Sequence, residues 1–338
     1  MANYDDVVIS TRIRLARNAD GIPFPRKLND ERAFSVIMKA GEMTAKSLFP
    51  FKFYQMGHLA EVDRQAIFER HLISRDLMQN LKTGAVIISD KEDMSIMINE
   101  EDHYRIQAIS KGFNIKDAYD RAITFDNALA GNIKLAFSDK LGYLTSCPTN
   151  VGTGLRASVM VFLPALTMSG KINPLIDSIQ QLSLTVRGVY GEGSGADGYM
   201  YQISNQISLG QSEKEIIDNV TKVIDVICKS EMKERKNIQE AEGLRLTDRV
   251  MRAYGVLSEA RLLSSQELLQ YASIIKLGSS LGIIKLNSDV YDLIVDVQPA
   301  NLTKLKGKSL TPDERDVFRA EIVRRAMKKI LGGQNESR

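Results

Sequence analysis

The chain has 338 residues, of which 43% are hydrophobic and 26% charged, and its formal net charge is +3. This length allows one large domain or two smaller ones. The charge is too close to balance to indicate a partner such as nucleic acid or a membrane surface, so any basic site must be local. No apolar run approaches the ~20 residues that span a bilayer, and the N-terminal MANYDDVVIS lacks the features of a secretion signal.

Cysteine and histidine usage argues against a structural metal site. The two cysteines, Cys147 and Cys228, are far apart in the sequence, which is typical of a cytoplasmic protein with reduced thiols. The three histidines, His58, His71 and His103, show no metal-ligand spacing. We therefore expect a cytoplasmic protein that has no metal site of its own.

The first two thirds of the chain mixes strands and helices. We expect strands over 6–15, 84–90, 94–100, 103–110, 140–147, 182–188 and 198–205, and helices over 30–48, 61–78 and 115–130. The run GLRASVMVFLPAL (154–166) predicts a buried helix. Strands and helices do not alternate regularly, so the predicted fold class is α+β, an antiparallel sheet flanked by helices.

After Leu209 the pattern becomes helical. Residues 211–238 form a long charged helical pattern that Gly243 interrupts, and Thr247 is the expected N-cap of the helix that follows. Helical patterns continue to the end of the chain. We expect two domains, residues 1–225 with the sheet and residues 226–338 as a helical C-terminal domain.

The stretch STRIR (10–14) places Arg12 and Arg14 on one face of a strand. Two adjacent guanidinium groups repel each other unless an anion bridges them, so the pair indicates a polyphosphate clamp. A solvated sheet face explains the same residues, and this stretch alone does not decide between the two. The stretch NEEDHYR (99–105) has the same ambiguity: Glu101 and Arg105 either face a cleft or belong to a polar turn.

The stretch TSCPTNVGTGLRASVM (145–160) combines a cysteine, a proline turn and two glycines. Its GTGLRA piece mimics a dinucleotide-binding fingerprint, but the strand and the βαβ unit that such a site needs are missing. Arg156, at the start of the expected helix, indicates an anion site at a helix N-terminus. Cys147 is either an ordinary buried cysteine or a thiolate that nearby arginines favour.

Arg187 directly precedes GVYGEGSG (188–195), a glycine-rich turn that encloses Glu192. The chain contains no P-loop and no protein-kinase motif. If it handles a nucleotide, arginine side chains must therefore hold the phosphates.

These four motifs, in this order, resemble the catalytic domain of the phosphagen kinases, the ATP:guanidino phosphotransferases, over residues 7–225. Within that superfamily the chain is similar to the bacterial protein-arginine kinases. STRIR begins at Ser10, which leaves no room for the helical N-terminal domain of phosphagen kinases. In addition, RDVFRA (315–320) matches the RDxxRA phosphoarginine-binding motif of that branch.

The resemblance implies transfer of the γ-phosphoryl group of ATP, with Mg²⁺, to arginine side chains of proteins. It implies that Glu101 is the catalytic base, that Glu192 orients the guanidinium and that Cys147 lies beside it. Met160 stands where phosphagen kinases usually have a histidine, and His71 is expected on the adenine side unless it is an ordinary half-buried helix residue. The implied ATP-binding residues are Ser10, Thr11, Arg12, Ile13, Arg14, His71, Arg105, Arg156, Ala157, Ser158, Val159, Met160, Arg187, Gly188, Val189, Tyr190, Gly191 and Glu192.

The resemblance also implies an allosteric phosphoarginine site. It comprises Arg315, Asp316, Val317, Phe318, Arg319 and Ala320. Thr311 and Glu314 predict a capping box that starts this helix, with Pro312 at its first position. Arg315 and Arg319 then lie at i and i+4 on one face, where a solvated helix surface is the alternative.

The implied partners are protein substrates with accessible arginines, a Clp ATPase and protease system, a heat-shock repressor and a zinc-containing activator protein. A homodimer is also implied. Two other functions remain open at the level of sequence. One is a kinase of free arginine or another small guanidino compound, and the other is a catalytically inactive adaptor that binds phosphoarginine.

Overall fold

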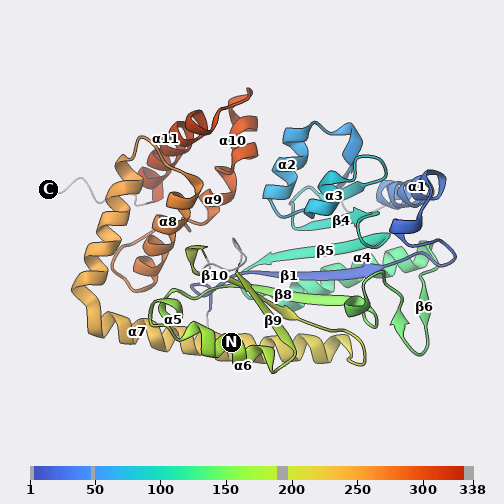
Figure 1. Cartoon of the computed structure of the whole chain (residues 1–338), viewed down its shortest axis with the longest axis horizontal. Coiled ribbons are helices and arrows are strands. Elements are labelled where there is room, and N and C mark those ends of the chain that lie inside the picture. Colours follow the sequence, from blue (N-terminus) through green and yellow to red (C-terminus); the bar gives the residue numbers. More distant parts are fainter. Residues whose placement is uncertain (1–3, 47–49, 189–196, 331–338) are drawn as a thin grey trace.

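The computed structural model of the chain describes residues 4–46, 50–188 and 197–330. Within these ranges an eight-stranded sheet has the order β2-β3-β4-β5-β1-β8-β10-β9, and each neighbouring pair is antiparallel (Figure 1). The strands are β1 (Val8–Arg17), β2 (Phe51–Gln55), β3 (Ala85–Ser89), β4 (Met94–Ile98), β5 (Tyr104–Lys111), β8 (Leu155–Phe162), β9 (Leu184–Gly188) and β10 (Met200–Asn205). The predicted α+β fold class is confirmed.

The sheet has one apolar and one polar face, because successive side chains of a strand point to opposite sides. On the central strand β1, Ile13 and Leu15 are fully buried in the main hydrophobic core. Arg12 and Arg14 alternate with them and point to the other side. The same alternation continues on the neighbouring strands, so one face builds the core and the other presents polar groups.

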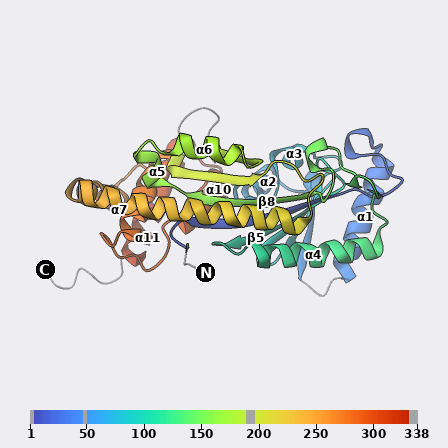
Figure 2. The same cartoon turned by 90° about the horizontal axis from the view of Figure 1, so that it is seen from below.

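Four helices cover the apolar face. They are α1 (Asp30–Lys46), α4 (Ile115–Asn132), α6 (Ile172–Gln180) and the first half of α7 (Glu213–Glu259). Their buried side chains in the main core include Val36, Ala122, Ile179 and Ile224. Figure 2 shows α4 and α7 running along this face of the sheet.

The opposite face is covered at its two ends and left open between them. At one end α2 (Glu61–Glu69) and α3 (Arg75–Gln79) pack on β3 and β4, where Ile67 and Leu77 contact a separate apolar cluster that includes Val86. The helices of the C-terminal region stand over the other end (Figure 1). The polar centre of the sheet lies between these two groups.

The C-terminal region is helical, as predicted, and its hydrophobic core also includes Phe162 of β8 and Met200 of β10. Beyond α7 it contains α8 (Ser265–Ser280), α9 (Asp292–Asp296), α10 (Pro299–Lys306) and α11 (Pro312–Ile330). The predicted capping box is present: the amide of Thr311 donates to the Glu314 carboxylate and the amide of Glu314 donates to the Thr311 hydroxyl. None of the described helices is long and apolar enough to cross a bilayer.

Helix α7 kinks where the sequence predicts an interruption, but the chain does not leave the helix there. The kink is at Glu242, which has non-helical angles (φ −128°, ψ 22°). Thr247 is not an N-cap, since its hydroxyl donates to the carbonyl of Gly243 within the helix, over 2.8 Å. The helix also continues without a break past residue 225.

The prediction of a buried helix over 154–166 is wrong. Residues 155–162 form β8, a strand in the middle of the sheet, and only the following α5 (Pro164–Met168) is helical. Ala157 and Val159 point into the core, whereas Arg156 and Ser158 belong to the polar face. Most residues from Leu155 to Phe162 are apolar, and periodicity alone does not distinguish a short apolar strand from a segment of buried helix.

Two further boundaries differ from the predictions. The helix expected over 61–78 is two helices, separated by a turn in which His71 has a positive φ of 61°. Of the strand expected over 140–147, only the two residues of β7 (Gly142–Tyr143) are extended, paired with β6 (Phe137–Ser138). The turn that contains His71 borders the open part of the sheet.

Candidate active site

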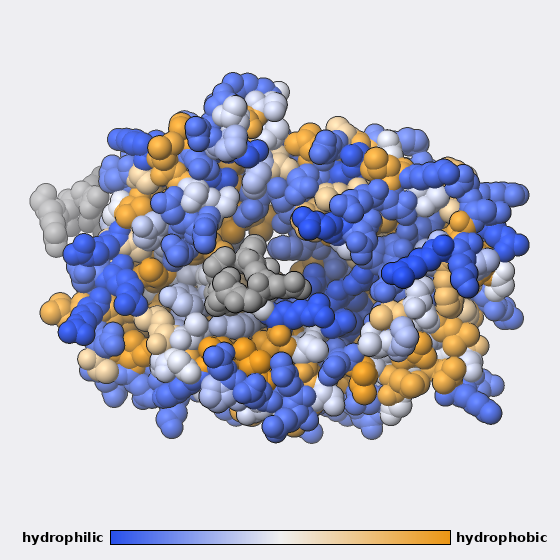
Figure 3. All heavy atoms as spheres, viewed as in Figure 1, coloured by the Kyte–Doolittle hydropathy of each residue, from blue (hydrophilic) through white to orange (hydrophobic). Residues whose placement is uncertain are grey.

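The polar face of the sheet forms the floor of a cleft with a volume of about 1620 Å³. The turn after α2 lines one side of this cleft, and the segment 276–298 of the C-terminal region lines the other. Figure 3 shows the surface hollowed between these two groups of helices. Small-molecule sites usually have volumes of about 300–1,000 Å³, so this cleft has room for two reactants.

Five arginines from four strands line the cleft. They are Arg12 and Arg14 on β1, Arg105 on β5, Arg156 on β8 and Arg187 on β9. The register of the sheet explains their convergence, because it places Arg14 directly opposite Arg156 and Arg12 opposite Ser158. Sequence motifs that lie up to 175 positions apart (12 and 187) thus meet on one surface.

The half-buried arginines Arg12 and Arg14 of β1 hydrogen-bond to neutral side chains. Arg12 Nη2 donates to Gln202 Oε1 over 2.6 Å, and Arg14 Nη2 donates to Ser158 Oγ over 3.2 Å. The buried Nε atoms of Arg14 and Arg156 have no hydrogen-bond partner in the part of the chain that the structure describes. A buried donor without an acceptor costs free energy, so the arrangement suits a ligand that supplies acceptor oxygens.

The arginines also depress one another's pKa. Burial, with the charges of Arg105 and Arg156, lowers the pKa of Arg12 to about 10. Burial and the charges of Arg12, Arg105 and Arg156 lower the pKa of Arg14 well below its ordinary value. A polyanion bound between these groups favours their charged forms and offsets the repulsion.

Arg105 differs from the others because it has a carboxylate partner. Its Nη1 atom lies 2.7 and 2.8 Å from the two carboxylate oxygens of Glu100. Burial alone would raise the pKa of Glu100, but Arg105 and the Ser74 hydroxyl lower it below its ordinary value. This ion pair fixes the orientation of the Arg105 side chain, which lies at one end of the row formed by the five arginines.

Glu101 follows in the loop between β4 and β5 and is half-buried. Burial raises its pKa, and the neighbouring Asp102 charge raises it further. Asp102 holds the loop in place: its Oδ1 atom accepts from Asn18 Nδ2 over 2.6 Å and from the amide of Ser146 over 2.7 Å. The Glu101 loop is thereby tied to the turn that carries Cys147.

Cys147 lies half-buried at the start of a short turn, η3 (Pro148–Asn150), with its Sγ atom 3.1 Å from Thr149 Oγ1. Burial, Arg187 and Arg105 lower the pKa of Arg156, while Cys147 and Glu101 act in the opposite direction. Glu101 and Cys147 therefore lie close enough to Arg156 to act on its charge. Arg156 itself is on a strand, so the predicted anion site at a helix N-terminus is wrong; its anion-binding position depends on the sheet register.

His71 borders the cleft in the turn between α2 and α3. Its backbone carbonyl accepts from Gln107 Nε2 over 2.9 Å. Its side chain is exposed in the cleft, yet the surrounding protein and the Arg12 charge lower its pKa. The imidazole is therefore neutral at physiological pH and not part of the cationic row.

The structure separates the expected ATP-binding residues into two groups. Ser10, Ser158, Met160 and Gly188 line the cleft together with His71 and the five arginines. Thr11, Ile13, Ala157 and Val159 are buried on the core side, where the Thr11 hydroxyl donates to the carbonyl of Gly112. Val189, Tyr190, Gly191 and Glu192 lie outside the described residues.

Sequence reasoning missed several side chains of the cleft. Gln202 lies opposite both Arg187 and Met160 in the sheet and contacts Arg12. The alternation in MYQISN (200–205) places Gln202 on the same face as Met200 and Ser204, which is a usable signal. Nothing in the sequence indicated the cleft-lining residues of the C-terminal region, among them Lys276, Asp289, Tyr291 and Asp292.

Comparisons with known proteins place the chain in a family. Residues 34–234 match the family described as ATP:guanido phosphotransferase, C-terminal catalytic domain. The chain belongs to the ATP:guanido phosphotransferase family. Residues 243–338 match the protein-arginine kinase McsB C-terminal domain, so the helical region has a counterpart within one branch of the family.

Similar proteins cover nearly the whole chain. A protein-arginine kinase of Caldanaerobacter subterraneus subsp. tengcongensis is 48% identical over 336 residues, which are 97% of this chain and 99% of that protein. A protein-arginine kinase of Bacillus licheniformis is 43% identical over 337 residues, 98% of this chain and 93% of that protein.

Solved structures of the family share the fold. A lombricine kinase has a TM-score of 0.60 and 29% identity, and the match covers 68% of each chain. The duplicated taurocyamine kinase from Schistosoma mansoni has a TM-score of 0.62 over 79% of this chain and 39% of the other. Its identity is 23%, so it speaks for the fold alone.

In the region matching the C-terminal domain, the RDVFRA residues lie on α11, but their two arginines differ. Arg319 is 1% exposed, and its guanidinium donates to the carbonyls of Val297 and Leu263 and pairs with Asp316. Arg315 is half-buried. The structure therefore shows Arg319 as a residue that ties α11 to neighbouring loops, and not as one of two open cations.

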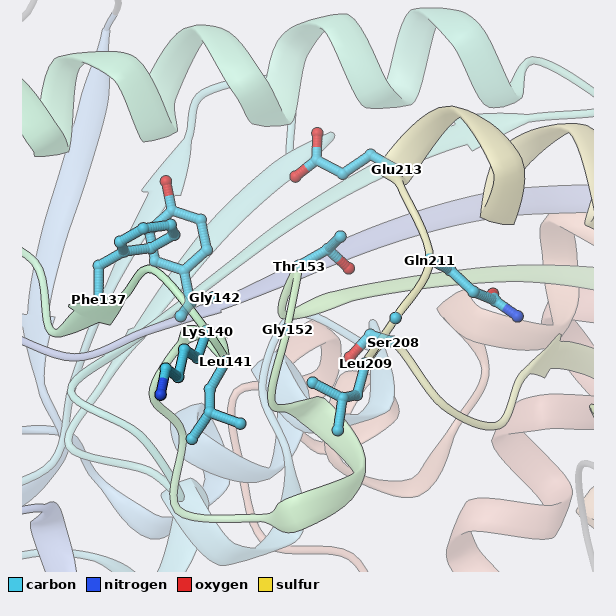
Figure 4. Close-up of a pocket in the computed structure, with 12 residues that line it drawn as sticks. Phe137, Lys140, Leu141, Gly142, Gly152, Thr153, Ser208, Leu209, Gln211 and Glu213 are labelled. Atoms are coloured by element: carbon cyan, nitrogen blue, oxygen red, sulfur yellow. The ribbon is translucent and has the colours of Figure 1, made fainter.

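A smaller cavity of about 330 Å³ lies beside the β6–β7 hairpin and shares no lining residue with the cleft (Figure 4). Figure 4 shows Phe137, Leu141 and Glu213 around it. One cation, the exposed Lys140, is among its lining residues. Arg17 lies nearby but stacks over the ring of Tyr143 (3.6 Å to the centroid) and is paired with Asp126. The row of arginines that suits a polyphosphate lines the cleft and not this cavity.

Proposed function

We propose that this chain transfers the γ-phosphoryl group of ATP to the guanidinium groups of arginine side chains in proteins. The observation that carries the proposal is the row of five arginines that lines the cleft on the polar sheet face. The names of the relatives, protein-arginine kinases with 43–48% identity over almost the whole chain, support the choice of acceptor.

The arginine row supplies the positive charge that phosphoryl transfer needs. Charge spreads over the oxygens of the transferring group in the transition state, and catalysis of this reaction consists mostly of positioning and charge stabilisation. Arg12, Arg14, Arg105, Arg156 and Arg187 bind the phosphates in this proposal. His71 contacts the nucleotide on the adenine side, beyond the cationic row.

Glu101 acts as the base. A guanidinium group is protonated at neutral pH and has no free lone pair for attack. As its nitrogen bonds to the γ-phosphorus, the bond from that phosphorus to the β,γ-bridging oxygen breaks, ADP leaves, and the guanidinium proton passes to Glu101. The raised pKa of Glu101 makes it a stronger base. Glu192 orients the guanidinium and Cys147 contacts it.

Mg²⁺ belongs to the nucleotide in this proposal. In the three described ranges no group of three or more His, Cys, Asp or Glu side chains is arranged to hold a metal ion, so the residues present do not fit a resident Mg²⁺ site. Protein-bound Mg²⁺ commonly keeps several waters and is held largely by substrate phosphates. We assign it to the substrate, and no residue of the chain is given the role of a Mg²⁺ ligand.

The test is ATP-dependent labelling of an unstructured protein. After incubation with Mg-ATP, mass spectrometry that preserves N–P bonds is expected to find phosphoarginine. Glu101→Gln should abolish it, whereas Asp139→Asn, an exposed site outside the cleft, should not. Efficient turnover of free arginine without protein labelling would show a small-molecule kinase. Binding of phosphoarginine peptides without ATP turnover would show an inactive adaptor.

We also propose the wider setting that the family branch implies. The 315–320 motif binds phosphoarginine and regulates the enzyme. The proteins that the enzyme phosphorylates pass to a Clp ATPase and protease system, and a heat-shock repressor is among them. A zinc-containing protein activates the enzyme.

Free thiols at Cys147 and Cys228 support a cytoplasmic location. Two exposed apolar side chains of the C-terminal region, Leu262 between α7 and α8 and Leu305 on α10, support a homodimer. Light scattering after gel filtration tests this.

A further inference from the structure

Asn18 directly follows β1, and its side-chain amide forms three hydrogen bonds with two other segments of the chain. The Nδ2 atom donates to Asp102 Oδ1 over 2.6 Å and to the carbonyl of Leu144 over 3.0 Å. The Oδ1 atom accepts from the amide of His103 over 2.9 Å. All three partners lie 84 to 126 positions away in the sequence, and Asn18 itself is 1% exposed. One buried amide therefore joins segments that only the fold brings together.

The three bonds match the donors and acceptors of an asparagine side chain. Nδ2 carries two hydrogens, and each has an acceptor, while the amide oxygen accepts in the opposite direction. In the reverse orientation the amide oxygen would face the Asp102 carboxylate and the Leu144 carbonyl, and Nδ2 would face the amide N–H of His103. The network therefore fixes one orientation of the side chain. An aspartate of the same shape has two acceptor oxygens and, when ionised, no hydrogen to donate.

The first segment that Asn18 binds is the loop between β4 and β5, which carries Glu101. Asp102 and His103 follow Glu101 directly, so the Asn18 amide holds the two residues next to it in the sequence. The backbone of the same segment adds a contact, since the amide of Ala19 donates to Nδ1 of His103 over 3.1 Å. Both Asp102 and His103 are buried, at 2% and 0% exposure. The end of β1 thus fixes the backbone on the C-terminal side of Glu101.

The second segment is the turn that carries Cys147. Leu144, whose carbonyl accepts from Asn18, lies three positions before Cys147. The amide of Ser146, the residue before Cys147, donates over 2.7 Å to Asp102 Oδ1, the same oxygen that Asn18 binds. The Glu101 loop and the Cys147 turn therefore meet at one carboxylate oxygen, and Asn18 binds both that oxygen and the turn.

We propose that Asn18 is a positioning residue for phosphoryl transfer, which sets the Glu101 loop against the Cys147 turn from the end of β1. The proposal rests on the proposed function, because it needs Glu101 to take the guanidinium proton and Cys147 to contact the acceptor. Arg12 and Arg14 lie on the same strand, but the ladders with β5 and β8 hold that strand without the Asn18 side chain. Loss of the amide bonds therefore acts on the acceptor half of the site and leaves ATP binding in place.

The test is a charge-swap cycle in the full-length chain, with Asn18→Asp, Asp102→Asn and the double variant. Asn18→Asp puts a second carboxylate against Asp102, across a contact that measures 2.6 Å in the wild type. Misplacing a reacting group by about 1 Å reduces rates up to about 100-fold, so kcat should fall about tenfold or more. The KM for ATP should stay within about twofold of wild type, because the lost interaction is not one with the nucleotide.

The double variant should recover part of the lost activity. Its new amide at position 102 can donate to the new carboxylate at position 18 and can still accept from the amide of Ser146. We expect its kcat to exceed that of Asn18→Asp at least about threefold. Asp102→Asn alone also removes a charge next to Glu101 in the sequence. The effect of Asn18→Asp is therefore compared with and without Asp102→Asn, and the separate effect of that charge cancels.

Glu231→Gln on α7 controls for a loss of stability alone. Glu231 is fully buried and pairs with Arg235. Its carboxylate accepts from the amides of Ala165 and Leu166, both over 3.0 Å, and none of these residues lines the cleft. The variant should lower the unfolding midpoint while kcat stays close to wild type. If Asn18→Asp does not fold, Asn18→Ser, which keeps one hydroxyl, should show the reduced kcat and the unchanged KM for ATP to a smaller extent.

Three results overturn the proposal. The first is an equal loss of kcat from Asn18→Asp with and without Asp102→Asn, and the second is wild-type kcat in Asn18→Ser. The third is a fall of kcat in Glu231→Gln that matches Asn18→Asp at the same loss of stability. A wild-type chain that phosphorylates no protein overturns the proposed function and this inference with it. An active wild type without rescue by the swap overturns the inference alone.

Discussion

Arg14 on β1 and Arg156 on β8 face each other directly across an antiparallel ladder, and each has a buried Nε atom without a described hydrogen-bond partner. Like charges in direct cross-strand contact destabilise a sheet. The fold holds them together because apolar neighbours on the same strands, such as Ile13 and Val159, are fully buried on the other face. The site is therefore prepared for an anion at a cost in stability.

This relationship predicts opposite effects of Arg14→Met on stability and on nucleotide binding. Without ligand, the free energy of unfolding should rise by about 1 kcal/mol or more, because a desolvated, repelled cation is replaced by an apolar chain of similar length. The stabilisation that a nucleotide gives the wild type, about 2.7 kcal/mol at one hundred times Kd, should be lost. Denaturant titrations with and without Mg-ATP measure both effects.

Arg17→Met is the matched control. Arg17 lies on the same strand and is fully buried, whereas Arg14 is half-buried, and the Nε and Nη2 atoms of Arg17 each donate to a carboxylate oxygen of Asp126, both over 2.8 Å. Its loss leaves an unpaired buried carboxylate, so the free energy of unfolding should fall by about 3–5 kcal/mol. A similar loss of stability in ligand-free Arg14→Met would show that Arg14 is not an unsatisfied charge in the folded protein.

The sequence predicted the residues of the floor better than their arrangement. The five motif arginines line one cleft, and the alternation that places Arg12 beside Arg14 is visible in the letters themselves. The register that brings Arg156 opposite Arg14 is not, because it depends on long-range pairing of β1 with β8. The apolar run of β8 is compatible with a helix as well as a strand, which is why that element was predicted wrongly.

The contribution of the C-terminal region to the cleft was unpredictable for a different reason. Tyr291 lies in a polar stretch of irregular backbone with no periodicity, and its significance comes from contacts with Gly198 and Ser273 in distant segments. Similarly, the i and i+4 spacing of Arg315 and Arg319 is real, but spacing on one helix says nothing about the loops that bury Arg319. Local sequence patterns predict which face of a helix or strand a residue occupies. Long-range packing decides whether other segments of the chain cover that face.

Glu101 predicts a pH dependence of activity and stability. Because burial raises its pKa, the acid limb of kcat/KM should lie above the ordinary glutamate value of about 4.3. Glu101 ionises more easily in the unfolded chain than in the folded one. The free energy of unfolding of the wild type, relative to that of Glu101→Gln, should therefore fall as the pH rises from about 4.3 through the folded pKa of Glu101. Above the folded pKa the difference should level off. Urea titrations of both proteins across this range, with a pH–rate profile, test the sign. An acid limb at or below 4.3 would contradict it.

Glu69 predicts coupling between the two walls of the cleft. This carboxylate at the end of α2 accepts hydrogen bonds from the amides of Ala300 and Asn301 at the start of α10, at 3.0–3.1 Å. Glu69→Ala removes an N-terminal cap, so the free energy of unfolding should fall by about 1 kcal/mol. Since His71 lies two residues beyond, the KM for ATP should rise while kcat changes little.

The matched control for Glu69 is Asp63→Ala on the same helix. Asp63 pairs with Lys304 of α10 at 2.7 Å, but both side chains are well exposed. Such surface pairs contribute about 0–1 kcal/mol, so neither stability nor the KM for ATP should change measurably. Equal effects of the two variants would show that the capping contact has no special role, and steady-state kinetics with ATP as the varied substrate measures the difference.

The two motif arginines of α11 predict separable phenotypes. Arg319 donates to two backbone carbonyls, those of Val297 and Leu263, and losing such buried bonds to a charged donor costs about 1.5–3 kcal/mol each. Arg319→Ala should therefore destabilise the C-terminal region, and a lost response to phosphoarginine in that variant would not identify a binding residue.

Arg315 is half-buried and lies on the first turn of the helix. Arg315→Ala should keep the wild-type unfolding midpoint. Its affinity for a phosphoarginine peptide, measured by calorimetry, should fall at least tenfold. A tenfold loss corresponds to about 1.4 kcal/mol, which is the size of one lost charge-assisted contact. Unchanged peptide affinity in Arg315→Ala would remove the motif from the proposed regulatory site.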